Sequence, residues 1–292
     1  MTSDVATLRR ALAGVRGLVL DADGVIVLRG EPIPGAPEAL ARLASAGIPV
    51  RVVTNYSSAH RSTLAAGLAR PGFNPDPERI ITAASVAAAY TATRFARRSL
   101  FVIANADALR EFDGQHLLSA EEAAEPGARV AAVVVGDGGD DLSYRNLDTA
   151  FRLIRGGAAF LAMHRNPWWL TRRGPTLDAG AFVAGLEYAL GGRATVLGKP
   201  SPVVFRQALA GLASDHGLRR LAPSEAAMVG DDPSADIAAA KRVGLRGILV
   251  LTGKTSAAEA AASTARARPG RAPDAIAASL AEVVAALFEG GS

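Results

Sequence analysis

A short apolar run that ends in two aspartates constrains this chain more than any other feature. Residues 18–20, Leu-Val-Leu, lead directly into Asp21, and Asp23 follows two residues later. Such a run is typical of a buried strand in a parallel sheet, where both faces are covered. Functional groups collect outside the carboxyl edge of such a sheet. The run therefore predicts that Asp21 lies at this edge. Asp23 can point back to the same place, because side chains recur with a period of two along extended chain.

The two carboxylates admit two interpretations. Carboxylates this close repel each other unless a cation lies between them or one of them is protonated, which indicates a catalytic or metal site. The alternative is an aspartate that caps a turn or a helix. The motif alone leaves both open, so the rest of the chain has to decide.

Composition excludes several function classes. The chain has 292 residues, 49% of them hydrophobic, which is enough for one large or two modest domains. It has no cysteine, which excludes disulfides, thiolate metal sites and a cysteine nucleophile. Charged residues interrupt the first 17 residues, and no apolar span is long enough to cross a bilayer, so we expect a cytoplasmic protein without a membrane partner. A net charge of +4 without a basic, aromatic-rich stretch argues against nucleic acid and suits a small anionic substrate.

Strands and helices alternate along the first part of the chain. A helix is predicted from Ile33 to Gly47, and the strand after it ends at Thr54 and Asn55. This alternation predicts an α/β fold built on a doubly wound parallel sheet. We expect residues 56–58 to open a helix through Leu68, whose first N–H groups form an anion cradle; an ordinary helix cap is the alternative.

An inserted unit is predicted in the middle of the chain. Residues 84–188 have their own strand and helix pattern, so we expect a smaller α/β cap domain there, between core segments 1–83 and 189–292. The core pattern resumes with a strand over 194–198 that ends in Lys199. A further strand ends in Asp231, and Asp236 opens the helix that follows.

One loop of the predicted cap is unusual. Residues 164–174 hold both tryptophans of the chain together with three arginines. Such a loop is either a surface or dimer contact or a substrate-facing loop that binds an anionic group. The sequence does not separate these interpretations. The residues concerned are His164, Arg165, Trp168, Arg172 and, after the loop, Asp178.

Two apparent motifs fail on spacing. Gly253-Lys254-Thr255 resembles the end of a phosphate-binding P-loop, but the upstream glycine at position 247 is one residue too far away and a strand fills the interval. The four histidines show no metal-ligand spacing.

Four strand-end motifs occur in a fixed order: Asp21-Ala22-Asp23-Gly24, Thr54, Lys199, and Gly230-Asp231-Asp232 with Asp236. In this order the chain resembles the haloacid dehalogenase superfamily of phosphohydrolases. Further segments resemble subfamily IIA, and within it the group of phospholysine, phosphohistidine and inorganic pyrophosphate phosphatases. These segments are 33–36, 53–55, 177–180, 198–202 and 249–254.

The resemblance implies roles for the aspartates. Asp21 would be the nucleophile that forms an aspartyl-phosphate. Mg²⁺ would be held by the Asp21 carboxylate, the backbone carbonyl of Asp23 and the Asp231 carboxylate. Asp23 would protonate the leaving oxygen and then deprotonate the attacking water, which requires a raised pKa.

The resemblance also implies how the phosphoryl group is held. Thr54, the N–H of Asn55 and Lys199 would bind its oxygens, where transition-state charge is stabilised. Asp236 would orient Lys199 or the waters of the metal; the alternative is a carboxylate that only favours the first turn of a helix. The inserted cap would close over the site, exclude water and select the substrate.

The sequence thus predicts a Mg²⁺-dependent phosphatase of a small phosphorylated metabolite. A phosphomonoester is the first expectation, with pyrophosphate or a phosphoramide beside it. A non-catalytic module that binds a phosphorylated ligand or a partner is one alternative. A haloacid dehalogenase-type hydrolase is another, although its relatives lack the acidic cluster that Asp23 and Asp231 suggest. The cap loop could also form a homodimer.

Overall fold

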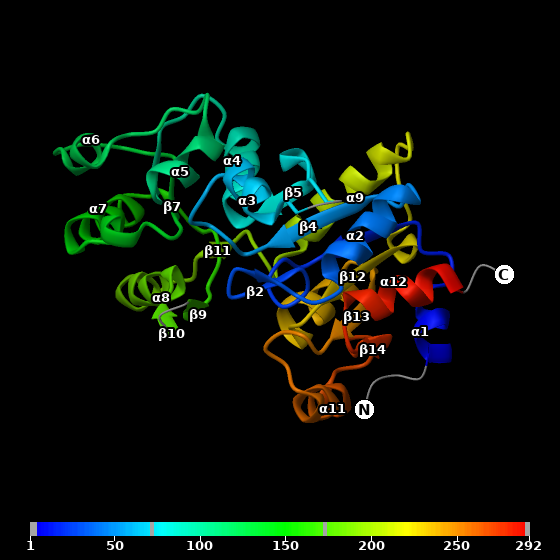
Figure 1. The fold of residues 1–292 in the computed structure, drawn as a ribbon. Helices are drawn as coiled ribbons and strands as arrows, with labels where there is room; N and C mark the ends of the chain where they lie inside the picture. Colours follow the sequence, from blue (N-terminus) through cyan, green and yellow to red (C-terminus); the bar gives the residue numbers. More distant parts are fainter. Residues whose placement is uncertain (1–4, 71–72, 172–173, 290–292) are drawn as a thin grey trace. The chain divides into compact units, whose positions relative to one another are not determined.

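The protein consists of two compact units (Figure 1). The computed structural model describes residues 5–70, 73–171 and 174–289. The first unit takes the chain up to residue 54, residues 65–81, and the chain from residue 199 onward; the second takes 55–64 and 82–198.

A parallel six-stranded sheet forms the centre of the first unit, in the order β14-β13-β12-β1-β4-β5. From β1 the chain adds β4 and β5 on one side and, later, β12, β13 and β14 on the other. The order therefore reverses between β1 and β12, where ligands bind in open α/β sheets. The strands are β1 (Gly17–Leu20), β4 (Val50–Thr54), β5 (Ile80–Thr82), β12 (Ala226–Gly230), β13 (Arg246–Val250) and β14 (Ala275–Ala277).

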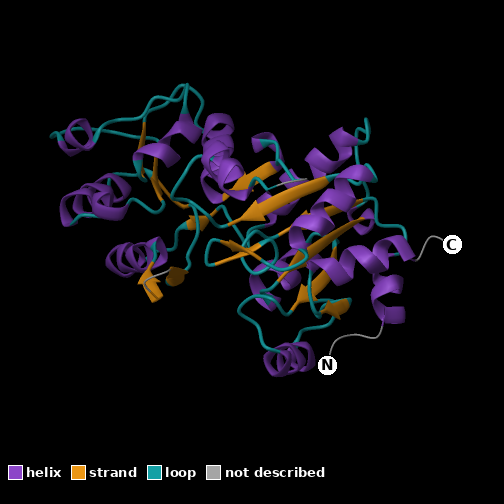
Figure 2. Ribbon diagram, in the orientation of Figure 1, coloured by secondary structure: helices purple, strands orange, loops and turns teal. Residues whose placement is uncertain are grey.

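Helices in two groups surround this sheet (Figures 1 and 2). In one group α1 (Val5–Leu12) and α2 (Ala36–Ser45) pack against α12 (Leu280–Glu289). In the other, α9 (Pro202–Asp215) packs on β4 and on α10 (Ala239–Arg242). The other elements of this unit are the hairpin β2 (Val27–Leu28) and β3 (Glu31–Pro32), α3 (Arg61–Leu68), which crosses into the second unit, η1 (Pro77–Arg79), η4 (Pro223–Glu225), η5 (Pro233–Ala238) and α11 (Ala257–Arg266).

The second unit has its own four-stranded parallel sheet, in the order β11-β8-β7-β6. Its core includes Phe101, Val133 and Val183.

The predicted α/β class, with a doubly wound sheet and an inserted α/β cap, is confirmed. The elements are α4 (Ala83–Arg94), β6 (Leu100–Ile103), α5 (Ala106–Leu109), η2 (Arg110–Phe112), α6 (Ala120–Ala124), β7 (Ala132–Val135), η3 (Gly139–Asp141), α7 (Tyr144–Arg155), β8 (Ala159–Ala162), β9 (Trp168–Thr171), β10 (Gly174–Leu177), α8 (Ala179–Leu190) and β11 (Thr195–Val196).

The strand before Lys199 differs from the prediction. The sequence places it in the core sheet, but β11 pairs with β8 in the sheet of the second unit. Lys199 therefore does not end a strand of the six-stranded sheet. The physical reason is that a strand of two residues carries no periodicity that assigns it to one sheet or the other.

The helix expected from residue 56 also differs, because α3 begins at Arg61. Its first N–H groups are not an open anion cradle. The backbone N–H of Arg61 donates to Glu111 Oε1 at 2.7 Å, and the Arg61 guanidinium lies 3.1 Å from Glu111 Oε2. A carboxylate of the chain itself thus meets the positive end of this helix.

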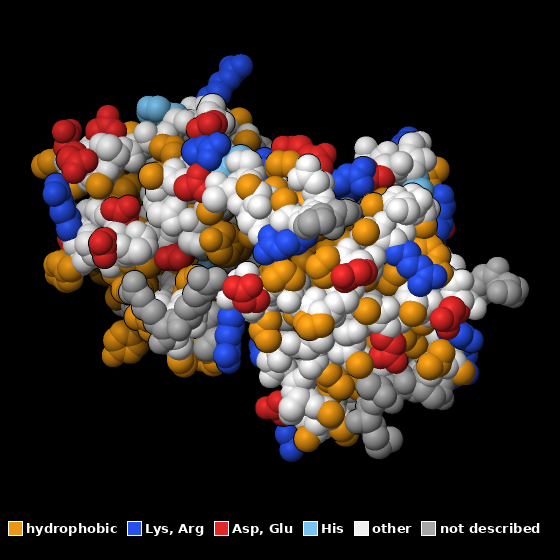
Figure 3. All heavy atoms as spheres, in the orientation of Figure 1, with side chains coloured by type: hydrophobic (Ala, Val, Ile, Leu, Met, Phe, Trp, Pro, Cys, Tyr) orange, Lys and Arg blue, Asp and Glu red, His pale blue; other side chains and the backbone are white. Residues whose placement is uncertain are grey.

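The surface drawn in Figure 3 carries acidic and basic side chains interspersed with apolar ones. Among the described residues, no helix combines the length and the hydropathy that crossing a membrane requires.

Candidate active site

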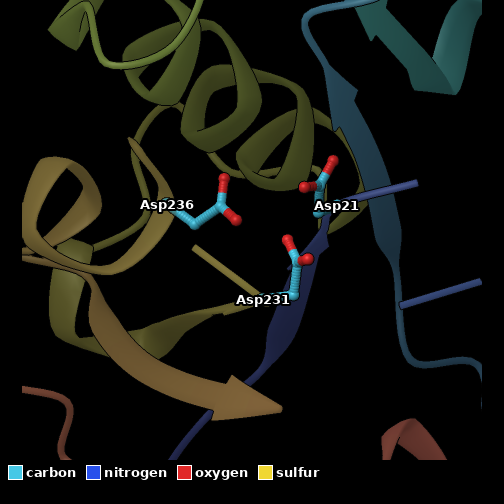
Figure 4. A group of neighbouring side chains, drawn as sticks. All are labelled: Asp21, Asp231 and Asp236. Atoms are coloured by element: carbon cyan, nitrogen blue, oxygen red, sulfur yellow. The ribbon is translucent and has the colours of Figure 1, made fainter. Parts of the chain in front are cut away.

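Three carboxylates meet at the carboxyl ends of two neighbouring strands. The register pairs Leu20 of β1 with Val229 of β12, so Asp21 and Asp231 leave the sheet side by side. Asp236, from η5, completes the group. One carboxylate oxygen from each lies within 4.8 Å of the others, and the three side chains point toward a common space (Figure 4).

Lys199 lies between two of these carboxylates. Its Nζ is 2.7 Å from Asp21 Oδ1 and 2.8 Å from Asp236 Oδ1. The lysine side chain is only 5% exposed, so these contacts are made away from bulk water. Burial alone would lower the pKa of Lys199, but the charges of Asp21 and Asp236 outweigh it and raise the pKa, so the ammonium stays charged.

Two hydrogen bonds with Asp232 hold Asp236 in place, one through its carboxylate and one through its backbone. Its Oδ2 accepts a hydrogen bond from the Asp232 backbone N–H at 3.1 Å, and its backbone N–H donates to Asp232 O at 3.1 Å. Asp236 is fully buried, and both of its oxygens are engaged. It is thereby fixed in place to face Lys199.

Over the described residues, Asp21 and Asp231 each have one carboxylate oxygen without a hydrogen bond or an ion pair. Asp21 Oδ1 takes Lys199 and the Ala22 N–H, and Asp231 Oδ2 accepts the Lys254 N–H at 2.8 Å. In the part of the chain that the structure describes, no hydrogen bond or ion pair reaches Asp21 Oδ2 or Asp231 Oδ1. These two oxygens are the ones that a metal ion or a substrate can meet.

The charges of the cluster do not balance. Three carboxylates face one lysine, which leaves two excess negative charges when all are ionised. An all-oxygen donor set with this charge fits Mg²⁺, which takes oxygen ligands and is bound through one or two carboxylates. The residues present therefore fit the expected cation.

Burial and this excess charge shift the pKa values of Asp21 and Asp231. Burial and then the nearby Asp236 charge raise the pKa of Asp21 well above its ordinary value, against the lowering effect of Lys199. Burial and Asp236 also raise the pKa of Asp231, to about 6, although the Lys254 N–H favours the ionised form. Without a cation, Asp21 and Asp231 thus hold their protons more tightly than free carboxyl groups do.

Asp23 occupies a tight turn beside the cluster. The turn is closed by a hydrogen bond from Gly24 N to Val27 O at 2.7 Å. Gly24 has a φ of +78°, and a Cβ there would lie 2.5 Å from Asp231 Oδ2, so no side chain fits. Asp23 itself is exposed, and partial loss of hydration raises the pKa of its carboxyl, opposed by the charges of Lys199 and Lys254.

A group of site residues was missed by the sequence analysis. Lys254 and Thr255, rejected as the end of a P-loop, hold Asp231 through the Lys254 N–H and through a hydrogen bond from Thr255 Oγ1 to Asp231 O at 2.6 Å. Gly253 lies so close that a Cβ would be 1.9 Å from Asp231 Oδ2. These residues could have been found from the sequence because they follow β13, the strand that lies beside β12 in the sheet.

Thr54 and Asn55 lie in different units. Thr54 is buried at the end of β4, the other neighbour of β1. Asn55 belongs to the second unit, where its Nδ2 donates to Asn166 Oδ1 at 3.3 Å.

His164 and Asp178 form a buried polar group in the second unit. Ser57 Oγ lies 2.8 Å from His164 Nε2, and Asp178 Oδ1 lies 3.6 Å from the same nitrogen. The Asn166 N–H donates to His164 Nδ1 at 3.3 Å, so the imidazole proton belongs on Nε2, between Ser57 and Asp178. Burial lowers the pKa of His164, against Asp178 and Asp137. A neutral ring that donates to Ser57 is not a base for it, so this is no nucleophilic triad.

Arg165 and Trp168, the other described residues singled out in the cap loop, have different surroundings. Arg165 makes an ion pair with Glu187 Oε2 at 2.7 Å. Trp168 is 58% exposed on β9. Arg172 lies outside the described residues.

Two family models match the chain. One, described as haloacid dehalogenase-like hydrolase, matches residues 18–117, and the other, described as HAD-hydrolase-like, matches residues 196–283. The chain is 33% identical over 249 residues to human haloacid dehalogenase-like hydrolase domain-containing protein 2, covering 85% of this chain and 89% of that protein. It is also 33% identical over 252 residues to human phospholysine phosphohistidine inorganic pyrophosphate phosphatase, with 84% and 86% covered.

Solved structures resemble this one over most of its length. A p-nitrophenyl phosphatase from Archaeoglobus fulgidus superimposes with a TM-score of 0.80 at 26% identity, covering 93% of this chain and 99% of that one. A glycerol phosphate phosphatase from Mycobacterium tuberculosis, in complex with magnesium, gives a TM-score of 0.77 at 28% identity, with 94% and 77% covered.

Removing the Asp231 charge is expected to stabilise the metal-free protein near neutral pH. Since folding raises this pKa from 3.8 to about 6, the folded state binds the proton more tightly, and that stabilisation is lost as the pH rises from about 4 to about 6. Asp231→Asn should therefore gain up to about 3 kcal/mol of unfolding free energy near pH 7.5 and less than about 1 kcal/mol near pH 4. Thermal unfolding of both proteins in the presence of chelator, near pH 7.5 and near pH 4, measures the stability difference at each pH.

The control for this prediction is Asp140→Asn, which removes an exposed carboxylate. It should leave the unfolding temperature unchanged at both pH values. A lower unfolding temperature for Asp231→Asn near pH 7.5 would contradict the charge imbalance.

Proposed function

The chain belongs to the haloacid dehalogenase-like hydrolases and is a phosphohydrolase, and we propose that it hydrolyses a small phosphorylated metabolite with Mg²⁺ and through an aspartyl-phosphate on Asp21. The observation that carries this proposal is the lysine between two carboxylates. Lys199 holds Oδ1 of Asp21, and Oδ2 of the same carboxylate is left to attack. Asp236 fixes the lysine from the other side.

In the first half-reaction, Asp21 Oδ2 attacks the phosphorus atom. The bond between phosphorus and the leaving oxygen breaks as the new O–P bond forms, and Asp23 gives its proton to the leaving oxygen. The raised pKa of Asp23 supports this role, because a carboxyl group that keeps its proton nearer to neutral pH is the better acid.

In the second half-reaction, water attacks the phosphorus atom of the aspartyl-phosphate. Asp23, now ionised, takes a proton from this water. The O–P bond to Asp21 breaks, inorganic phosphate leaves, and the Asp21 carboxylate is restored. One carboxyl group thus serves as acid and then as base.

The Asp21 and Asp231 carboxylates, with the backbone carbonyl of Asp23, would hold Mg²⁺. The cation supplies positive charge where carboxylates and phosphoryl oxygens meet, which otherwise repel each other. Lys199, the Thr54 hydroxyl and the Asn55 N–H would bind the phosphoryl oxygens. The dehalogenase alternative finds no support in this geometry, because that chemistry does not require a second and third buried carboxylate.

A phosphomonoester is the substrate class that the site favours. An alkoxide is a poor leaving group and needs a proton, which Asp23 would give. A nitrogen leaving group, as in phosphohistidine or phospholysine, is basic enough to take a proton from solvent and depends less on such an acid. Relatives named for glycerol phosphate, p-nitrophenyl phosphate and pyrophosphate define the first panel to test.

Asp21→Asn is expected to lower kcat on p-nitrophenyl phosphate by about a thousandfold or more, because an amide cannot form the acyl-phosphate. Phosphate release from the panel is measured with Mg²⁺ and with chelator. Asp140→Asn, an exposed aspartate, should keep full activity. Undiminished turnover by Asp21→Asn, or turnover that ignores chelator, would contradict the proposal.

Gly24→Ala is expected to abolish most activity, whereas Gly47→Ala should not. Both glycines have a positive φ, of +78° and +68°, so both variants carry similar backbone strain. Only at Gly24 would the Cβ meet Asp231; nothing lies within 4 Å of the Cβ at Gly47. We expect kcat to fall about a hundredfold for Gly24→Ala and less than twofold for Gly47→Ala, and we expect the lower unfolding temperature for Gly24→Ala, whose Cβ would also lie 2.9 Å from the Gly253 Cα. Equal activities would show that the close approach at Gly24 does not matter.

We also propose that the β9–β10 hairpin forms a homodimer. Trp168 and its cross-strand partner Leu177 share one face of the hairpin and are 58% and 62% exposed, which makes an apolar patch of the kind found at interfaces, and Trp169 is 40% exposed on the other face. Sedimentation should give a dimer for the unchanged protein and a monomer for Trp168→Ser with Trp169→Ser. Tyr188→Ser, which changes an exposed residue of α8, should remain dimeric. A monomeric unchanged protein would end this proposal.

A further inference from the structure

A cavity of about 740 Å³ lies in the first unit, apart from the acidic cluster. Its walls come from α11, from the segment of η5 and α10, and from the loop that precedes β14. None of the residues assigned to the active site lines it. Its size is within the range of ordinary ligand sites.

Four arginines line this cavity: Arg242, Arg266, Arg268 and Arg271. Over the described ranges, none of them makes an ion pair, whereas other arginines of the chain do, such as Arg51 with Asp215 at 2.5 Å.

Among its described residues, the lining contains one acidic side chain, Glu259. Its carboxylate accepts hydrogen bonds from Ser256 N at 2.8 Å and Ser256 Oγ at 2.7 Å, which cap α11, and these bonds lower its pKa. The Glu259 carboxylate therefore remains charged, but it is hydrogen-bonded to Ser256 at the N-terminal end of α11. The walls then carry four positive charges against one negative charge, and this excess of positive charge favours the binding of an anion.

We propose that this cavity binds a small polyanion that carries two or more phosphate groups. An arginine binds phosphate through two parallel N–H···O bonds, so four arginines exceed what one phosphate group needs. Among the residues that the structure describes, the lining also includes no aromatic side chain, so recognition depends on charge rather than on the stacking of a base. A compact polyphosphate chain matches both observations.

The walls of this cavity adjoin the segments that carry site residues. Pro200 follows Lys199 directly, and the Arg242 guanidinium donates to Pro200 O. Ser234 lies on η5, two residues before Asp236, and its backbone N–H donates to Asp232 Oδ1 at 2.7 Å. A bound polyanion would thus restrain the backbone on either side of the Lys199–Asp236 ion pair.

Calorimetric titration of inorganic triphosphate into metal-free, chelator-free protein tests the proposal. Without Mg²⁺ the acidic cluster repels the anion and no turnover occurs, so the result does not depend on the proposed phosphatase mechanism. We expect saturable binding that Arg266→Ala with Arg271→Ala weakens about tenfold or more. Arg266→Lys with Arg271→Lys, which keeps the charge and loses the planar fork, should recover only part of the affinity.

The matched control is Arg98→Ala with Arg129→Ala, which removes the same charge from another cavity, in the second unit. It should change the affinity less than twofold. Circular dichroism confirms that each variant is folded. Absence of binding, equal loss in the control variant, or binding of sulfate as tight as that of triphosphate would each overturn the proposal.

Discussion

The ion pairs of Lys199 with Asp21 and Asp236 determine how the site can work. Burying three carboxylates and one lysine costs solvation, and the attraction between them compensates only where the charges nearly balance. The lysine offsets one carboxylate, so the remaining charge of two is met by protons or by a divalent cation. Burial and this imbalance together raise the pKa values of Asp21 and Asp231, and the imbalance also creates the affinity for a cation.

The backbone around the cluster is shaped to bring these groups together. Gly24 and Gly253 approach Asp231 closely, and at Gly230 a Cβ would lie 2.4 Å from Asp236 Cβ. Three separate chain segments thus come near the carboxylates without side chains of their own. Hydrogen bonds from the backbone at Lys254 and Asp232 then fix the orientation of Asp231 and Asp236.

The parts of the site that lie at the ends of parallel strands could be predicted from the sequence. Asp21 and Asp231 follow apolar strands, and parallel strands bring their carboxyl ends to one edge, so their proximity could be predicted. The strand before Lys199 could not be assigned, because two residues carry no periodicity. The start of α3 was misplaced since the seryl residues at 57 and 58 resemble helix caps, whereas Ser57 hydrogen-bonds to His164. The contacts of Gly253 and Lys254 with Asp231 depend on a loop path that no local pattern encodes.

Trapping the phosphorylated enzyme tests the central claim most directly. The protein is mixed with p-nitrophenyl phosphate and Mg²⁺ under single-turnover conditions, quenched in acid within the turnover time, digested and analysed by mass spectrometry. The account predicts that the peptide containing Asp21 gains the mass of one phosphoryl group, and that this gain disappears as phosphate is released. Full phosphate release with no phosphorylated peptide at any time, or phosphorylation of a different residue, would contradict it.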